Sequence, residues 1–286
     1  MFERVLMAVD GSAHSQRALE AGRALALTAG SELRLLQVVE RGYGRKLSPV
    51  DLSDRTWAKE AVDRTVAELR EAGIEASGSC RCALRGHTAN EIRDEAARFR
   101  ASVIIMGTRG LSDLAGATLG SVSHQVLHLG FLPVLLVHRD DAPISFHSIL
   151  LATDGSQGAE GALDAAGQLA RSVDGEVHVL HCAEYEVVRG GGYDLELFED
   201  AMGIVKRAVA DLHRRGAKAT GDVHRCQRGT VAREIVGQAT ARGAALIAMG
   251  TRGRSDLGSL VLGSTLHRVL HLAGVPVLAV PQATGS

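Results

Sequence analysis

The chain has 286 residues, of which 45% are hydrophobic and 23% charged, a composition typical of globular proteins. A formal net charge of −1 gives no overall attraction to nucleic acid or an anionic membrane, and aromatic residues, at 3%, are too few for base-stacking surfaces. No apolar run approaches the roughly 18 residues of a membrane span, and the N-terminal residues 1–12 lack a signal-peptide core, so we expect a cytoplasmic protein.

Short apolar runs alternate with longer amphipathic ones along the first half of the chain. The spacing of Ala18, Ala21 and Leu25 predicts a helix. Residues 102–107 are rich in β-branched side chains without polar alternation, which is typical of a buried parallel strand. Strands are predicted at Arg4–Val9, Glu32–Glu40, Ile74–Leu84, Ser102–Gly107 and Pro133–Val137, and helices at Ser12–Ala29, Asp51–Ala72, Ala89–Phe99 and Gly120–Leu129.

The second half of the chain repeats the first. The motif AVDGS at Ala8–Ser12 recurs as ATDGS at Ala152–Ser156, 144 residues later, and MGTRG at Met106–Gly110 recurs at Met249–Gly253, 143 residues later. A period this long indicates two whole domains rather than solenoid repeats. The polar, proline-containing stretch His138–His147 separates them, so we predict domains at residues 1–140 and 146–286.

The alternation of strands and helices predicts an α/β fold in which each domain is a parallel sheet, doubly wound, with helices on both faces. Ligands of such sheets bind beyond the carboxyl ends of the strands, where the strand order reverses. The motifs VDGS, QVVE and MGTRG all stand at that edge.

A glycine pattern follows the fourth strand of each predicted domain. Gly107 and Gly110 are followed by nine residues and then by Gly120-Ser121, and the second half repeats the same spacing. Glycines let the backbone approach a ligand closely, and the free amides of a helix N-terminus attract phosphate. The pattern therefore predicts a phosphate site in each half, although turns and helix caps alone would also use these glycines. It is neither a Walker A motif nor a dinucleotide fingerprint.

The spacing G-x2-G-x9-G-S after the fourth strand, with an aspartate ending the first strand, resembles the universal stress protein family. Because both halves carry it, the chain is similar to a tandem member of that family. The resemblance implies a five-stranded parallel sheet of order 3-2-1-4-5 in each half, and ATP as ligand, with or without Mg²⁺.

The resemblance also implies which residues contact the nucleotide in each half. In the first half these are Ala8, Asp10, Val38, Met106, Gly107, Gly110, Gly120, Ser121, Val122 and Ser123. In the second half they are Ala152, Asp154, Cys182, Met249, Gly250, Gly253, Gly263, Ser264, Thr265 and Leu266. From their place between the paired glycines, Arg109 and Arg252 are added as candidate contacts to the phosphates. Val38 and Cys182 occupy matching positions, so the adenine wall is expected to differ slightly between the halves.

Several residues have two interpretations. Asp10 and Asp154 fit a nucleotide contact or a turn, and Arg109 and Arg252 fit a triphosphate contact or a solvated loop. The glycine-rich segments Arg41–Leu52 and Tyr185–Glu196 are long enough for lids over the site, or are plain insertions.

Each half also carries two histidines four residues apart on the last predicted helix, at His124 and His128 and at His267 and His271. That spacing suits a metal, but no third ligand is evident. We therefore expect no metal site, with Val126, Leu127, Val269 and Leu270 packing inward.

The sequence supports three functional hypotheses. In the first, ATP is a regulatory ligand of a stress-response protein, because no general base and nucleophile stand out as a catalytic set. In the second, the protein is a slow ATPase or autokinase. In the third, it is a nucleotide-independent scaffold whose halves form an internal pseudo-dimer, with a homodimer as a further assembly.

Overall fold

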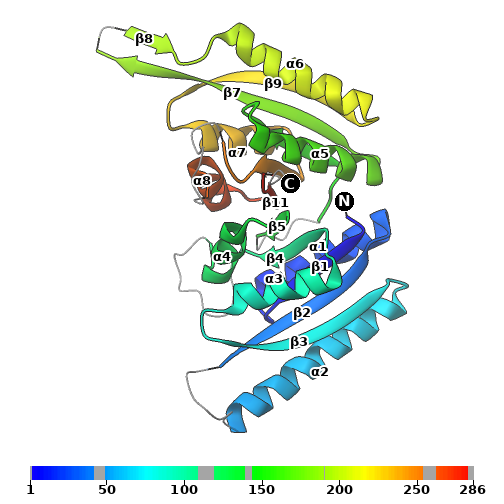
Figure 1. Cartoon of the computed structure of the whole chain (residues 1–286). Coiled ribbons are helices and arrows are strands. Elements are labelled where there is room, and N and C mark those ends of the chain that lie inside the picture. Colours follow the sequence, from blue (N-terminus) through cyan, green and yellow to red (C-terminus); the bar gives the residue numbers. More distant parts are fainter. Residues whose placement is uncertain are drawn as a thin grey trace. The chain divides into compact units, whose positions relative to one another are not determined.

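The computed structural model describes residues 2–41, 49–108, 119–138, 144–189, 191–253 and 262–282, with side chains described from residue 55 onward in the second of these ranges. The chain divides into two compact units, Met1–Ile144 and Ser145–Ser286. We call them unit 1 and unit 2 and describe each by itself (Figure 1).

Unit 1 alternates strands and helices, and the elements begin and end within two residues of the predicted bounds. They are β1 (Arg4–Val9), α1 (Ala13–Ala29), β2 (Glu32–Arg41), α2 (Pro49–Glu71), β3 (Ala76–Leu84), α3 (Thr88–Phe99), β4 (Val103–Gly107), α4 (Ser121–Leu129) and β5 (Val134–Val137). All neighbouring strands pair in parallel, in the order β3-β2-β1-β4-β5.

Unit 2 repeats this arrangement. Its elements are β6 (Ser148–Ala152), α5 (Gln157–Ser172), β7 (Glu176–Val188), β8 (Gly191–Asp194), α6 (Phe198–Arg214), β9 (Lys218–Gln227), α7 (Val231–Ala241), β10 (Leu246–Gly250), α8 (Ser264–Leu272) and β11 (Val277–Val280). Strands β9, β7, β6, β10 and β11 pair in parallel in that order, which matches unit 1.

Strand β8 is an addition that the sequence prediction did not include. It pairs antiparallel with the end of β7, so residues 185–188 and 191–194 form paired strands rather than the loop expected there. Backbone hydrogen bonds between β7 and β8 hold this segment in a regular conformation, whereas its glycine content alone suggested an irregular insertion. The corresponding segment of unit 1 lies largely outside the described residues.

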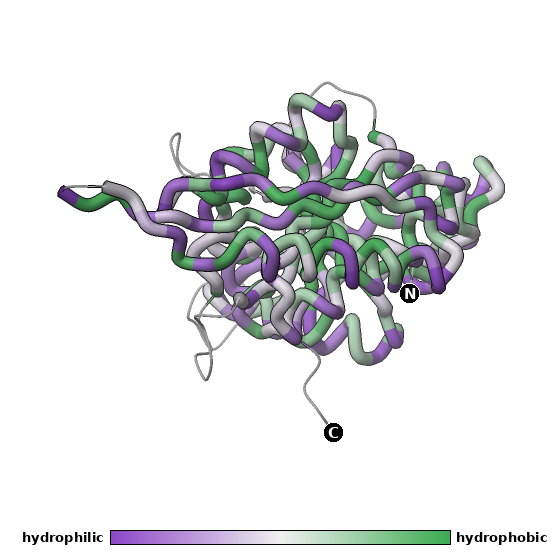
Figure 2. Tube along the Cα trace, turned by 90° about the horizontal axis from the view of Figure 1, so that it is seen from above, coloured by the Kyte–Doolittle hydropathy of each residue, from purple (hydrophilic) through white to green (hydrophobic). Residues whose placement is uncertain are grey.

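Local signals explain where the helices start and stop. The Ser12 hydroxyl accepts a hydrogen bond from the Ser15 amide at 3.2 Å and caps α1, which ends at Gly30 with φ of +67°. Whole strands contribute to the core of each unit: every residue of β4 and β5 in unit 1 and of β11 in unit 2 is buried. Along the helices, hydrophobic and hydrophilic residues alternate, as amphipathic packing requires (Figure 2).

Helices cover both faces of each sheet. In unit 1, α1 packs on β1 and β4, α2 on β2 and β3, and α3 on β2 and α4. Right-handed crossovers place α1 and α2 on one face and α3 and α4 on the other. In the described ranges, no helix is both long and apolar enough to cross a membrane.

One charged side chain lies within the packing of unit 1. Glu95 on α3 has no exposed surface, and it accepts hydrogen bonds from three arginines. Arg34 Nη2 lies 2.8 Å from Oε1, Arg81 Nη2 lies 2.8 Å from Oε2, and Arg98 Nε lies 3.2 Å from Oε2. The network joins α3 to β2 and β3.

Candidate functional site

The strand order of each unit brings the predicted site residues to one edge of its sheet. In unit 1, β1 lies between β2 and β4, so Ala8 is in register with both Leu36 and Met106. In unit 2, Ala152 is in register with Leu180 and Met249. In unit 1 the connections that leave β1 and β4 lead to opposite ends of the sheet, so the strand order reverses between these two strands. Ligands of doubly wound sheets bind at such a point.

A backbone hydrogen bond joins the two ends of the glycine motif. The amide of Gly120 donates to the carbonyl of Thr108 at 2.6 Å, and Gly263 donates to Thr251 at 2.9 Å. This bond holds the start of α4 beside the end of β4, and the start of α8 beside the end of β10. The same contact in both units accompanies the equal spacing of their motifs.

The first turns of α4 and α8 point their amides toward this edge. Gly120 and Gly263 are the N-cap residues, and neither helix has a side-chain cap within the described part of the chain. An uncapped helix start leaves backbone N–H groups available to an anion. The Ser123 hydroxyl donates to the Gly107 carbonyl at 2.9 Å and ties α4 to β4.

Close backbone packing in unit 2 requires glycine. A Cβ on Gly250 would lie 2.6 Å from the carbonyl oxygen of Gly158, and one on Gly158 would lie 2.9 Å from that of Arg252. A Cβ on Gly253 would lie 2.8 Å from Asp154 Oδ2. These three glycines let the end of β10 approach both α5 and the aspartate.

Asp10 and Asp154 each have a turn role. Asp10 Oδ1 accepts from the Ser12 amide at 2.9 Å, and Asp154 Oδ1 accepts from the Ser156 amide at 3.0 Å. The turn fixes each carboxylate at the end of its strand, and both aspartates also line a cavity. The two interpretations made from sequence are thus compatible.

Each unit has a cavity at this edge. The unit 2 cavity measures about 290 Å³ and the unit 1 cavity about 100 Å³. All the residues predicted for unit 2 line its cavity: Ala152, Asp154, Cys182, Met249, Gly250, Arg252, Gly253, Gly263, Ser264, Thr265 and Leu266. In unit 1 the predicted residues that line the cavity are Ala8, Asp10, Val38, Met106, Gly107, Gly120, Ser121, Val122 and Ser123, while Arg109 and Gly110 fall outside the described residues.

A pair that has no sequence motif lines the unit 2 cavity: buried His181 and half-buried Glu196. His181, only 3% exposed, lies with Nδ1 2.7 Å from the Thr153 carbonyl and Nε2 2.6 Å from Glu196 Oε2. The carbonyl and the carboxylate are both hydrogen-bond acceptors. Forming both hydrogen bonds therefore requires a hydrogen on each ring nitrogen, or a hydrogen on the Glu196 carboxyl group. Unit 1 has Val9 and Gln37 at the positions of Thr153 and His181.

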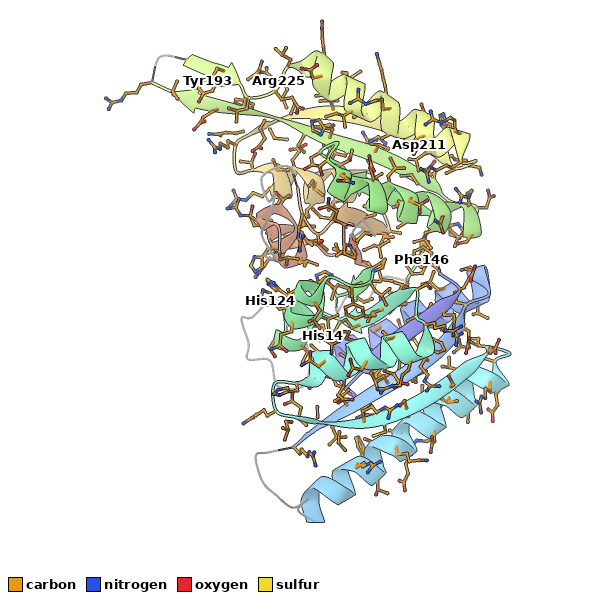
Figure 3. The ribbon with its side chains drawn as sticks, viewed as in Figure 1. His14, His124, Phe146, Tyr193, Asp211 and Arg225 are labelled. Carbon is orange, nitrogen blue, oxygen red and sulfur yellow. The ribbon has the colours of Figure 1, made fainter. Side chains whose placement is uncertain are left out.

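The β7–β8 hairpin brings Glu196 to the cavity. The Leu195 amide donates to the Glu184 carbonyl at 2.9 Å, which turns the chain back toward β7 after β8. On the hairpin, the Tyr193 hydroxyl donates to Glu186 at 3.0 Å, and Arg225 of β9 pairs with Asp194; Tyr193 and Arg225 are labelled in Figure 3. The hairpin thus supplies a wall of the site.

Cys182 contributes an uncharged wall. The hydrogen bond with Cys226 and the burial of the thiol raise the pKa of Cys182 above its ordinary value. A protonated thiol is a poor nucleophile and packs as a small apolar group. Within the described ranges, no group of three or more histidine, cysteine or acidic side chains is placed to hold a metal ion.

Comparison with known proteins identifies this architecture. The family model described as "Universal stress protein family" matches residues 1–138 and 145–281. The chain belongs to the universal stress protein family. Its two matched regions correspond to the two units.

Other universal stress proteins share either the whole chain or one unit. One from Mycobacterium tuberculosis is 28% identical over 295 residues, covering 98% of this chain and 97% of that protein. YxiE of Bacillus subtilis is 34% identical over 146 residues, covering 47% of this chain and 99% of YxiE. A crystal structure of a universal stress protein from Archaeoglobus fulgidus, 25% identical, covers 99% of this chain and 100% of its own with a TM-score of 0.78.

The His181–Glu196 contact of this universal stress protein predicts a coupled effect on stability. In a double-mutant cycle, His181→Gln and Glu196→Gln each lower the free energy of unfolding by about 1–3 kcal/mol, because each removes one partner of a largely buried, charged contact. The double variant loses clearly less than the sum of the two. Urea unfolding of the four proteins measures the coupling, and additive losses would contradict the contact.

Proposed function

We propose that both units bind an adenine nucleotide, with ATP acting as a regulatory ligand in a stress response. One observation carries the proposal: in each unit, strand ends, a glycine motif and an uncapped helix start surround a single cavity. Helix amides suit the phosphates, and the uncharged Cys182 wall suits an apolar base. Gly250 and Gly253 let the end of β10 pack closely against α5 and Asp154, which keeps both glycines at the wall of the cavity.

The two units are proposed to differ in affinity. The unit 2 cavity, at about 290 Å³, is close to the lower end of small-molecule sites, roughly 300 Å³. The unit 1 cavity, at about 100 Å³, must widen to admit a nucleotide. We therefore expect tighter ATP binding in unit 2.

The test is ATP binding by the full chain, followed by calorimetry or equilibrium dialysis, with GTP as the comparison. Asp154→Asn is expected to weaken the tighter ATP site about tenfold or more, because a charged hydrogen-bond acceptor contributes roughly 1.5–3 kcal/mol. The variant keeps an oxygen for the turn to the Ser156 amide. Asp10→Asn should affect the weaker site in the same direction.

Asp174→Asn is the matched control for this experiment. Asp174 is exposed, pairs with Lys218, and has φ of +51°, a conformation that asparagine tolerates. The Asp174→Asn variant should bind ATP with the same affinity as the parent protein. Absence of adenine nucleotide binding at millimolar ATP would overturn the proposed function, and fast release of phosphate from bound ATP would favour an enzyme instead.

A further inference from the structure

Helices α4 and α8 each carry two histidines whose ring nitrogens converge. His124 Nε2 lies 3.2 Å from His128 Nε2, and His267 Nε2 lies 3.3 Å from His271 Nε2. The four-residue spacing puts both rings of a pair on one side of the helix. The same arrangement occurs in both units, in side chains that none of the site chemistry above uses.

The separation of these nitrogens fits two bonds to one metal ion. Zinc binds histidine nitrogen at about 2.0–2.1 Å, and two such bonds with ends 3.2 Å or 3.3 Å apart enclose an angle of about 103° or about 107°. A tetrahedral ion requires about 109°. A square-planar ion would need the nitrogens at about 2.9 Å, so the geometry favours a tetrahedral ion.

The rings also present these nitrogens on their facing edges. The ring centres are 4.3 Å apart in the first pair and 4.4 Å in the second, farther than the nitrogens themselves, with tilts of 55° and 51°. His124 and His128 are half-buried, while His267 and His271 are exposed. His124 is labelled in Figure 3.

The two pairs are distinct from the nucleotide cavities. None of the four histidines lines either cavity. As expected from the sequence, the neighbouring apolar residues pack inward: Val126, Leu127, Val269 and Leu270 are at most 3% exposed. These buried residues anchor the helices, and the histidines lie beside them on more exposed parts of the helix surface.

We propose that each histidine pair is a binding site for a divalent transition metal, with Zn²⁺ the ion that the geometry favours. The two Nε2 atoms are the protein ligands, and water completes the coordination. In the metal-free pair one Nε2 donates a hydrogen to the other. On binding, that hydrogen moves to Nδ1 of the same ring, so both rings remain neutral and both Nε2 lone pairs reach the metal. This proposal replaces our sequence-based expectation of no metal site.

Equilibrium dialysis of the full chain against Zn²⁺ tests the proposal, with protein that carries no histidine tag. The parent is expected to bind two ions per chain. His128→Ala and His271→Ala should each lose one ion, and the double variant should lose both. His213→Ala is the matched control, because His213 is an exposed helical histidine outside both pairs and should leave the stoichiometry unchanged.

A second measurement excludes binding by thiols. Co²⁺ replaces Zn²⁺, and the absorption that disappears in the double variant should contain no sulfur-to-metal charge-transfer band. Circular dichroism establishes that each variant folds. The proposal is overturned if the parent binds no Zn²⁺, if the variants retain two ions per chain, or if the lost band reports a thiolate ligand such as Cys226.

Discussion

Gly250→Ala is expected to lower the affinity of the unit 2 site for ATP at least tenfold and to destabilise that unit by about 1–3 kcal/mol. The added Cβ would lie 2.6 Å from the Gly158 carbonyl oxygen and 3.2 Å from that of Arg252. Both obstacles are backbone atoms, so the end of β10 or the start of α5 must move. Either movement displaces residues that line the cavity.

ATP titration and thermal unfolding of the full chain measure these two effects. Gly237→Ala is the control, because Gly237 is an exposed residue of α7 with no atom within 4 Å of an added Cβ. Alanine there should leave ATP affinity unchanged and slightly raise stability, as helix propensity predicts. Unaltered ATP binding by Gly250→Ala would show that the ligand does not use this part of the cavity.

Glu95→Gln should destabilise unit 1 by about 2–3 kcal/mol, the upper part of the range for hydrogen bonds to charged groups, because the three arginines left behind are partly exposed. The carboxylate is fully buried and is the shared acceptor for Arg34, Arg81 and Arg98. A neutral amide accepts fewer of their hydrogen bonds and leaves three guanidinium groups close together without their anion. Urea unfolding measures the loss.

The effect of Glu95 should depend on pH. Burial alone would raise the pKa of Glu95, but hydrogen bonds from Arg81 and Arg34 outweigh it and hold the pKa below the ordinary value. A lowered folded-state pKa stabilises the protein above the unfolded value, about 4.3, and that contribution is lost as the pH falls through the folded value.

The stability difference between the parent and Glu95→Gln should therefore be full at neutral pH and shrink in acid. Glu68→Gln, at an exposed position of α2, is the control and should change stability by no more than about 0.5 kcal/mol. A pH-independent difference between parent and Glu95→Gln would contradict the role of the ionised carboxylate.

The regular elements of the fold could be predicted from the sequence because each has a strong local pattern. The bounds of the strand Arg4–Val9 and of the helix that ends before Gly30 could be predicted from neighbouring residues alone. Strand β8 depends on pairing with β7, and its Gly191-Gly192 start resembles a loop. Glu95 was equally hidden, because a glutamate on a helix usually faces solvent, and two of its three arginine partners, Arg34 and Arg81, lie on strands distant in sequence.

The candidate site could be predicted to the extent that its residues belong to the repeated motifs. Gly263 and Asp154 stand at fixed places in those motifs and line the cavity. His181 and Glu196 have no motif, and the hairpin between them brings them together. A comparison of the halves did hold a signal, since Gln37 stands where His181 does and only the histidine offers a ring with two polar nitrogens.

The different walls of the two cavities show what joining two units in one chain permits. An assembly of two identical chains must give both of its sites the same side chains, since one set of residues serves each copy. Here Val9 and Val38 line one cavity, and Thr153 and Cys182 stand at the matching places in the other. Residues of one cavity can therefore change without any change in the other cavity. Every molecule still carries one cavity of each kind.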